Sequence, residues 1–249
     1  MVCFIDVHCH LDFDSLYSSL DNVIMEAKSA GVGIILTNGI DARTNRLSLG
    51  IAEKHSIVKS ALGIYPPVGH FAENELIKEL DFIRSKRKNI FAVGEIGMDF
   101  KNAHDKKVQE NVFVSQLGLA EDIGKPVVIH SREAEKEVID IMEKMKQGKV
   151  LLHCFHGRKS LIGKGIKLGF YFSISTNVVR SEHTQMLASL VPLNRIFAET
   201  DAPFMSPFKE KGNRPAFVVE SYKKIAEIKG ITIEEARNHI YMNWQRLFQ

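Results

Sequence analysis

Six histidines and carboxylates stand where short apolar segments of this sequence end. The first such segment ends at two histidines that are separated by one residue. Four later segments end near a further histidine, glutamate or aspartate. The six residues are His8, His10, Glu95, His130, His153 and Asp201. Imidazole and carboxylate groups are ligands that zinc, manganese and iron bind in proteins. Because six ligands exceed what one catalytic zinc needs, we expect two divalent ions.

These residues can be divided between two ions. His8, His10 and Asp201 are expected on one ion, and His130 and His153 on the other. His8 and His10 are two residues apart on an extended segment, so both side chains point to one face. Two ions about 3.5–4 Å apart would activate a water and hold the reacting group.

Glu95 is the expected bridge between the two ions. It ends the apolar segment at residues 90–95.

Eight apolar, β-branched segments alternate with segments of helical period. The apolar segments lie at 3–8, 33–37, 58–65, 90–95, 126–130, 150–154, 170–175 and 195–200. They are nearly continuously apolar, which is typical of strands buried on both faces. Over 249 residues, this alternation predicts a (β/α)8 TIM barrel, in which residues at the carboxyl ends of strands build the active site. An open doubly wound sheet gives the same alternation, although no Gly-rich phosphate fingerprint follows the first strand.

The expected domain is a single one, residues 1–249, with an extra C-terminal helix. Two further helices are predicted from about residue 216 to the end. The last should begin at Thr232, because Glu235 three residues later completes a capping-box pattern. No linker-like stretch or internal repeat divides the chain.

Composition limits the compartment and the partners. Thirty-three Lys and Arg against 30 Asp and Glu give a net charge of +3, which permits an anionic ligand without requiring one. Three cysteines cannot form a disulfide framework and fit a reducing cytosol. No apolar run approaches the roughly 20 residues that span a bilayer. We expect a soluble, cytoplasmic protein with no membrane partner, for which a monomer is compatible with the sequence.

Seven segments between residues 4 and 248 follow one another in the order of a known family's motifs. They are FIDVHCHLDF, ALGIYP, AVGEIGMDF, QENVFVSQLGLAEDIGKPVVIHSREA, LLHCFHG, FAETDAPFMSP and NWQRLF. The chain resembles the TatD-related metal-dependent deoxyribonucleases, a family of the amidohydrolase superfamily. The resemblance implies a TIM barrel with one or two divalent cations that hydrolyses phosphodiester bonds of DNA, often as a 3′–5′ exonuclease. It implies the same six metal ligands and DNA as the substrate.

The predicted reaction is attack on a phosphodiester by a metal-activated water. Glu95 and Asp201 are the predicted catalytic residues, with Asp201 accepting the proton of the water. The resemblance implies activity with magnesium, whereas the histidine-rich ligand set favours zinc, manganese or iron.

Two positions depart from the family's pattern, and two are predicted to contact substrate. Tyr65 stands in GIYP where the family usually has histidine, and His156 stands in HCFHG where it usually has a small residue. Tyr65 is predicted to contact the phosphate or a base, with packing against the following prolines as the alternative. Arg132 is expected to begin the next helix and to hold a phosphate oxygen.

A basic loop follows the last predicted strand. Lys209, Lys211 and Arg214 lie in SPFKEKGNRP. This loop either follows a nucleic-acid backbone or is an ordinary solvated loop.

Two other classes of function remain open. The first is a small-molecule amidohydrolase or a phosphoesterase on the same barrel, and the second is a metal-holding protein without catalysis. Many amidohydrolases bridge their metals with a carbamylated lysine where Glu95 stands. Phosphoesterases that begin with HxH usually carry a late Asp-x-His, whereas this chain has ETDAP. Both differences favour the nuclease.

Overall fold

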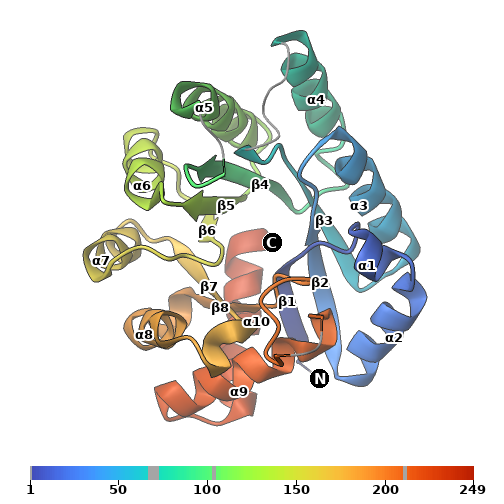
Figure 1. The fold of residues 1–249 in the computed structure, drawn as a ribbon, viewed down its shortest axis with the longest axis vertical. Helices are drawn as coiled ribbons and strands as arrows, with labels where there is room; N and C mark the ends of the chain where they lie inside the picture. Colours follow the sequence, from blue (N-terminus) through green and yellow to red (C-terminus); the bar gives the residue numbers. More distant parts are fainter. Residues whose placement is uncertain (1, 67–72, 103–104, 210–211) are drawn as a thin grey trace.

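Eight parallel strands pair in chain order, and helices surround them (Figure 1). The computed structural model describes residues 2–66, 73–102, 105–209 and 212–249. The strands are β1 (Phe4–Cys9), β2 (Val32–Asn38), β3 (Val58–Leu62), β4 (Ala92–Asp99), β5 (Val127–Arg132), β6 (Val150–Leu152), β7 (Tyr171–Ser175) and β8 (Ile196–Glu199).

The helices follow the strands in alternation. They are α1 (Asp14–Tyr17), α2 (Leu20–Ser29), α3 (Ala42–Lys54), α4 (Glu73–Ser85), α5 (Lys106–Asp122), α6 (Glu135–Lys144), α7 (Lys159–Lys167), α8 (Glu182–Leu190), α9 (Val218–Lys229) and α10 (Ile233–Phe248). Short 3₁₀ helices lie at η2 (Thr176–Val179), η3 (Leu193–Arg195) and η4 (Pro215–Phe217). Among the described residues, no helix has both the length and the apolar character needed to cross a membrane.

The sheet closes where β1 meets the segment after β8. Cys9 forms a parallel bridge with Ala202. The amide of Asp201 donates to the carbonyl of His8 at 2.9 Å, and the amide of His10 donates to Ala202 at 2.8 Å. The predicted (β/α)8 barrel is confirmed, and the open doubly wound sheet is wrong.

Apolar side chains fill the barrel and the layer between its strands and helices. Every residue of β4 and of β7 is buried, including the carboxylates Glu95 and Asp99 of β4. On the outside, α6 turns Val138, Ile139 and Met142 inward. Each such fully buried side chain contributes roughly 1.5–3 kcal/mol through removal of apolar surface from water.

The last helix covers the amino-terminal end of the barrel, opposite the strand ends that carry the histidines. Trp244 of α10 stacks on Phe91, which precedes β4, with ring centroids 5.9 Å apart. The amide of Asn243 donates to the carbonyl of Ile196 at 2.8 Å. The extra C-terminal helix therefore closes one end of the barrel and leaves the other end open for a site.

The start of α10 matches its sequence signal. Thr232 caps the helix: its hydroxyl accepts from the amide of Glu235 at 3.2 Å, and the Glu235 carboxylate accepts from the amide of Thr232 at 2.7 Å. This reciprocal pair satisfies two amides that the first helical turn leaves without a partner.

The predicted ends of β4 and β5 and the predicted start of α6 are wrong. Glu95 does not end its strand, because β4 continues to Asp99. Arg132 does not begin a helix: it ends β5, and α6 starts at Glu135. The reason is ladder pairing, since Asp99 lies opposite Arg132 and the amide of Phe100 donates to the Arg132 carbonyl at 2.9 Å.

Bulges interrupt the hydrogen-bond ladder in β1 and β4, the strands that carry His8 and Glu95. Between Val93 and Ile96, β4 advances three residues while β5 advances two, from Val127 to Ile129. Glu95 lies in this interval. A bulge adds a residue and turns a side chain away from the regular alternation. A similar shift between Asp6 and Cys9 of β1 contains His8.

A buried carboxylate joins the two ends of the barrel sheet. Asp6 on β1 is 0% exposed and accepts hydrogen bonds from the amide and the hydroxyl of Thr200 at 2.8 and 2.6 Å. The Thr200 hydroxyl also accepts from the amide of Ala202 at 3.1 Å. This contact fixes the segment after β8, and with it Asp201, against β1.

Candidate metal centre

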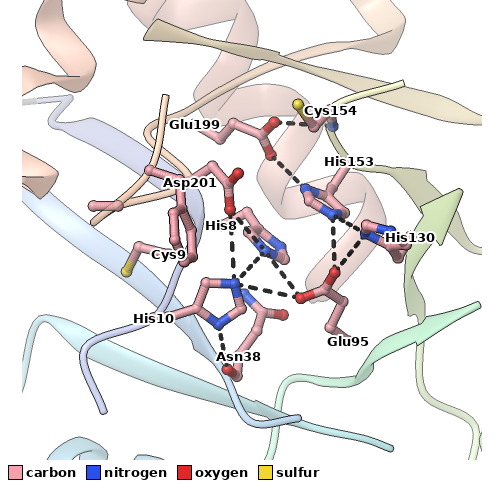
Figure 2. A network of polar contacts seen from close by, with 12 residues as sticks. His8, Cys9, His10, Asn38, Glu95, His130, His153, Cys154, Glu199 and Asp201 are labelled. Atoms are coloured by element: carbon pink, nitrogen blue, oxygen red, sulfur yellow. Dashed lines mark hydrogen bonds and ion pairs between the residues drawn. The ribbon is translucent and has the colours of Figure 1, made fainter. Parts of the chain in front are cut away.

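Six side chains converge at the open end of the barrel (Figure 2). They come from β1, β4 and β5 and from the residues that directly follow β1, β6 and β8. All are buried except one, which is half-buried. These are the six predicted residues, His8, His10, Glu95, His130, His153 and Asp201.

Glu95 lies between two pairs of histidines (Figure 2). Its Oε2 atom is 3.5 Å from Nε2 of His8 and 3.4 Å from Nε2 of His10. Its Oε1 atom is 2.8 Å from Nδ1 of His130 and 3.1 Å from Nε2 of His153. Each carboxylate oxygen therefore faces a different histidine pair, an arrangement that suits a bridge between two cations.

Asp201 lies on the side of the first histidine pair. Its Oδ1 atom is 3.6 Å from Nε2 of both His8 and His10. The backbone of Asp201 is left-handed, with φ of 56°, a conformation that aspartate adopts more readily than most residues. This turn directs the carboxylate back over the end of β1.

Backbone and buried groups orient two of the histidines. Nδ1 of His10 lies 3.0 Å from the carbonyl of Asn38, so its Nε2 points to Glu95 and Asp201. Nδ1 of His153 faces Glu199 at 3.7 Å. Such outer contacts fix the ring orientation of metal-binding histidines.

Glu199 belongs to the barrel wall, deeper than the mouth. It is 0% exposed. Its carboxylate accepts hydrogen bonds from the Ser173 hydroxyl at 2.6 Å and from the amide of Cys154 at 2.9 Å. Glu199 therefore supports His153 and the backbone beside it rather than the cavity.

Asp99 orients the half-buried histidine, and sequence reasoning missed it. Its Oδ2 atom lies 3.6 Å from Nε2 of His130 and accepts a hydrogen bond from the Tyr65 hydroxyl at 2.8 Å. The amide of Asn102 donates to its Oδ1 atom at 2.9 Å. Its spacing from Glu95 could have identified it, because residues four apart on one strand lie on the same face.

Burial and neighbouring charge set the protonation of these groups. Burial alone would raise the pKa of Glu95, but His153, His130 and His8 hold it well below its usual value. Burial lowers the pKa of His8 to about 4, so this imidazole is neutral. Burial raises the pKa of Asp201 to about 6. The site thus offers an anionic bridge and a neutral imidazole, which is the form that binds metal.

The donor set fits divalent cations. Nε2 of His8 and of His10 face each other at 3.3 Å, and Nδ1 of His130 faces Nε2 of His153 at 3.2 Å. Two imidazole lone pairs at this separation repel unless a proton or a cation lies between them. Three overlapping sets of ligand atoms each lie within 4.8 Å: His8, His10 and Glu95; Glu95, His130 and His153; and His8, His153 and Asp201. Nitrogen and oxygen donors of this kind suit zinc, manganese or iron.

A cavity of about 850 Å³ opens above the cluster and includes both residues predicted to contact substrate. Arg132 is exposed there, and the described residues provide its guanidinium with no ion pair. Tyr65 also lines the cavity, but its hydroxyl donates to Asp99. His156 lines the rim with its ring stacked on His183, centroids 5.1 Å apart.

One of the three cations of the basic loop after β8 is paired with the barrel wall. Arg214 forms an ion pair with Glu26 on α2 at 2.7 Å. Lys209 is exposed, and Lys211 lies outside the described residues. Arg214 therefore attaches the loop to the barrel wall.

Fold and site together define a class of protein. A (β/α)8 barrel with buried histidines and carboxylates at the carboxyl ends of its strands is the architecture of a barrel-type metal-dependent hydrolase. A sequence model of the family described as TatD related DNase matches residues 5–249. The chain belongs to this family and is a TatD-family metal-dependent hydrolase.

Known relatives agree over nearly their whole lengths. Deoxyribonuclease TATDN3 of Homo sapiens is 32% identical over 260 residues, covering 99% of this chain and 95% of that protein. An uncharacterized metal-dependent hydrolase of Methanocaldococcus jannaschii is 34% identical over 248 residues, covering 100% and 98%. The crystal structure of the TatD homolog YjjV of Escherichia coli matches with a TM-score of 0.91 at 26% identity, covering 100% of this chain and 99% of that one. The family resemblance inferred from the motifs is confirmed.

Proposed function

We propose that this protein is a two-metal deoxyribonuclease that removes nucleotides from DNA in the 3′–5′ direction. The observation that carries the two-metal proposal is the position of Glu95, whose two oxygens face separate histidine pairs at 2.8–3.5 Å. Support for DNA comes from the family and from the human relative that is named a deoxyribonuclease. The 3′–5′ direction follows the family resemblance.

The proposed ligands divide between two ions. His8, His10 and Asp201 hold one ion, and His130 and His153 hold the other. A bound pair of divalent cations neutralises the phosphate oxygens, stabilises the leaving oxygen and lowers the pKa of a coordinated water. The protein's own residues fix the positions at which this chemistry occurs.

The carboxylates have different tasks in this proposal. Glu95 bridges the two sites, since the surrounding histidines keep its pKa well below the usual value and leave it anionic. Asp201 takes the proton from the attacking water. Its Oδ1 atom faces His8 and His10, so Oδ2 is the oxygen available for the proton.

Two further residues of the cavity have roles in this proposal: one binds the substrate, and the other orients a metal ligand. Arg132 is exposed in the cavity and carries a permanent charge, so we assign it to a phosphate oxygen. Tyr65 orients His130 through Asp99, because its hydroxyl bonds this carboxylate at 2.8 Å and lies 3.5 Å from Nε2 of His130. Its ring remains available to the substrate at the cavity wall.

The test is a cleavage assay with end-labelled DNA. Purified protein is incubated with single- and double-stranded oligonucleotides, labelled at either end, in magnesium, manganese or zinc. We expect progressive shortening of the 5′-labelled strand and immediate release of a 3′ label as mononucleotide. The Asp201→Asn variant controls for a contaminating nuclease. Hydrolysis of a small phosphomonoester with all DNA left intact would favour the phosphoesterase alternative and contradict the proposal.

A further inference from the structure

We propose that Phe13 and Phe204 form a stacking site for the base of the terminal nucleotide. This inference rests on the proposed function and adds the group by which the substrate is recognised.

The two phenylalanines form one wall of the cavity beside the metal centre. Phe13 follows β1 and Phe204 follows β8, and both line the cavity. Their rings meet edge to face with centroids 5.5 Å apart and an interplanar angle of 84°. Phe204 is 48% exposed. A large aromatic side chain open to a substrate cavity offers a face on which a base can stack.

The aromatic wall formed by Phe13 and Phe204 lies next to His10, a proposed metal ligand. The ring of His10 lies 5.3 Å from Phe13 and 6.3 Å from Phe204, centroid to centroid. A phosphate held at the metal centre therefore places the adjoining sugar and base next to these rings. The wall is also carried by the two segments that bring His10 and Asp201 to the site, so its position relative to the reacting phosphate is fixed by the barrel.

Charges on the cavity wall argue against a groove that follows duplex DNA. Among the residues that the structure describes, the charged side chains of the cavity beyond the metal cluster are Lys101 and Arg132 together with Glu133 and Glu135. Two cations are balanced by two carboxylates, and the whole chain carries only +3. Phosphate contacts outside the metal centre are thus few. Stacking, which tolerates every base because each has a π-face, supplies recognition without such a groove.

The test compares Phe204→Ala with wild type on two single-stranded oligonucleotides. One carries a normal terminal nucleotide, and the other carries an abasic tetrahydrofuran residue at the same position. Loss of one stacked base corresponds to roughly a 5- to 150-fold rise in KM. We expect this rise for wild type when the base is removed, and for Phe204→Ala on the normal end, but no further loss when both changes are combined. The matched control is Phe208→Ala, because Phe208 is 43% exposed and packs on Phe217 outside the cavity.

A binding measurement separates this inference from the proposed function. An oligonucleotide with terminal 2-aminopurine and a nuclease-resistant phosphorothioate at its terminal linkage is titrated with manganese-loaded wild type, Phe204→Ala and Phe208→Ala. Quenching of its fluorescence by wild type and by Phe208→Ala, but not by Phe204→Ala, supports the stacking site even where no cleavage occurs. Equal quenching by all three proteins overturns the stacking site. Absence of cleavage by wild type in every metal overturns the proposed function instead.

Discussion

Replacement of Asp201 by asparagine is expected to lower kcat by ~10²–10⁴, the usual contribution of a positioned acid–base group. Asparagine keeps the shape of the side chain and one weak ligand oxygen, but it is a far poorer base. The variant should therefore retain most of its metal and its fold. Steady-state cleavage of end-labelled DNA measures kcat. Elemental analysis measures the metal content, and circular dichroism measures whether the fold is retained.

The geometry explains why this residue should act as the base. Asp201 faces His8 and His10 with one oxygen, and its side chain is 10% exposed at the cavity. Burial raises the pKa of Asp201 to about 6. A carboxylate held at this position can accept a proton from a water beside it.

Glu199→Gln is the matched control for Asp201→Asn. Glu199 lies two residues earlier, is 0% exposed and accepts from Ser173 and from the amide of Cys154. Its replacement should reduce thermal stability and affect turnover less. Near-normal turnover in Asp201→Asn would remove the proton acceptor from the mechanism.

A second large effect is expected when the histidine pair on the Oε1 side of Glu95 is removed. The double variant His130→Ala with His153→Ala should lose about one equivalent of metal relative to wild type. Cleavage should fall on the order of 10³-fold, because an ion that neutralises a phosphate contributes several kcal/mol and 1.4 kcal/mol is a factor of ten. The barrel should remain folded, since its core lies below these residues.

The control for the double variant is His156→Ala. His156 lines the same cavity, but it is exposed and its Nδ1 atom lies 2.7 Å from the carbonyl of Cys154. It should therefore keep the full metal content. Unchanged metal content in the double variant would show that His130 and His153 hold no ion.

The barrel and the ligand cluster were both accessible from the sequence, for related reasons. The carboxyl ends of all parallel strands in a barrel lie at the same end of the barrel. Polar residues at these strand ends therefore lie close together regardless of the loop conformations. The positions of His8 and His153 follow from this rule alone. The capping pair Thr232 and Glu235 was equally local, because both partners lie within one helical turn.

Features that depend on pairing between strands could not be predicted. The bulge that turns Glu95 toward both histidine pairs exists only in the register of β4 against β5. At Gly97, a Cβ atom would clash with the carbonyl oxygen of His130, so glycine permits the close approach of these strands. The contacts of Asp99 with Tyr65 and His130 likewise join separate segments. The spacing of residues along the sequence does not determine the distances between side chains on different strands.

The aromatic wall was hidden for another reason. Phe13 and Phe204 are separated by nearly the whole chain, and each alone is an ordinary apolar residue beside a ligand motif. Only closure of β1 against the segment after β8 places their rings 5.5 Å apart. The same closure brings Asp201 to His8 and His10.

The most direct measurement of the two-metal centre is anomalous diffraction from a crystal of the protein grown with manganese. Two peaks are predicted, about 3.5–4 Å apart, one beside Oε2 of Glu95 with His8 and His10 and the other beside Oε1 with His130 and His153. A single peak at full manganese occupancy, or two peaks that do not share Glu95, would contradict a centre bridged by this carboxylate.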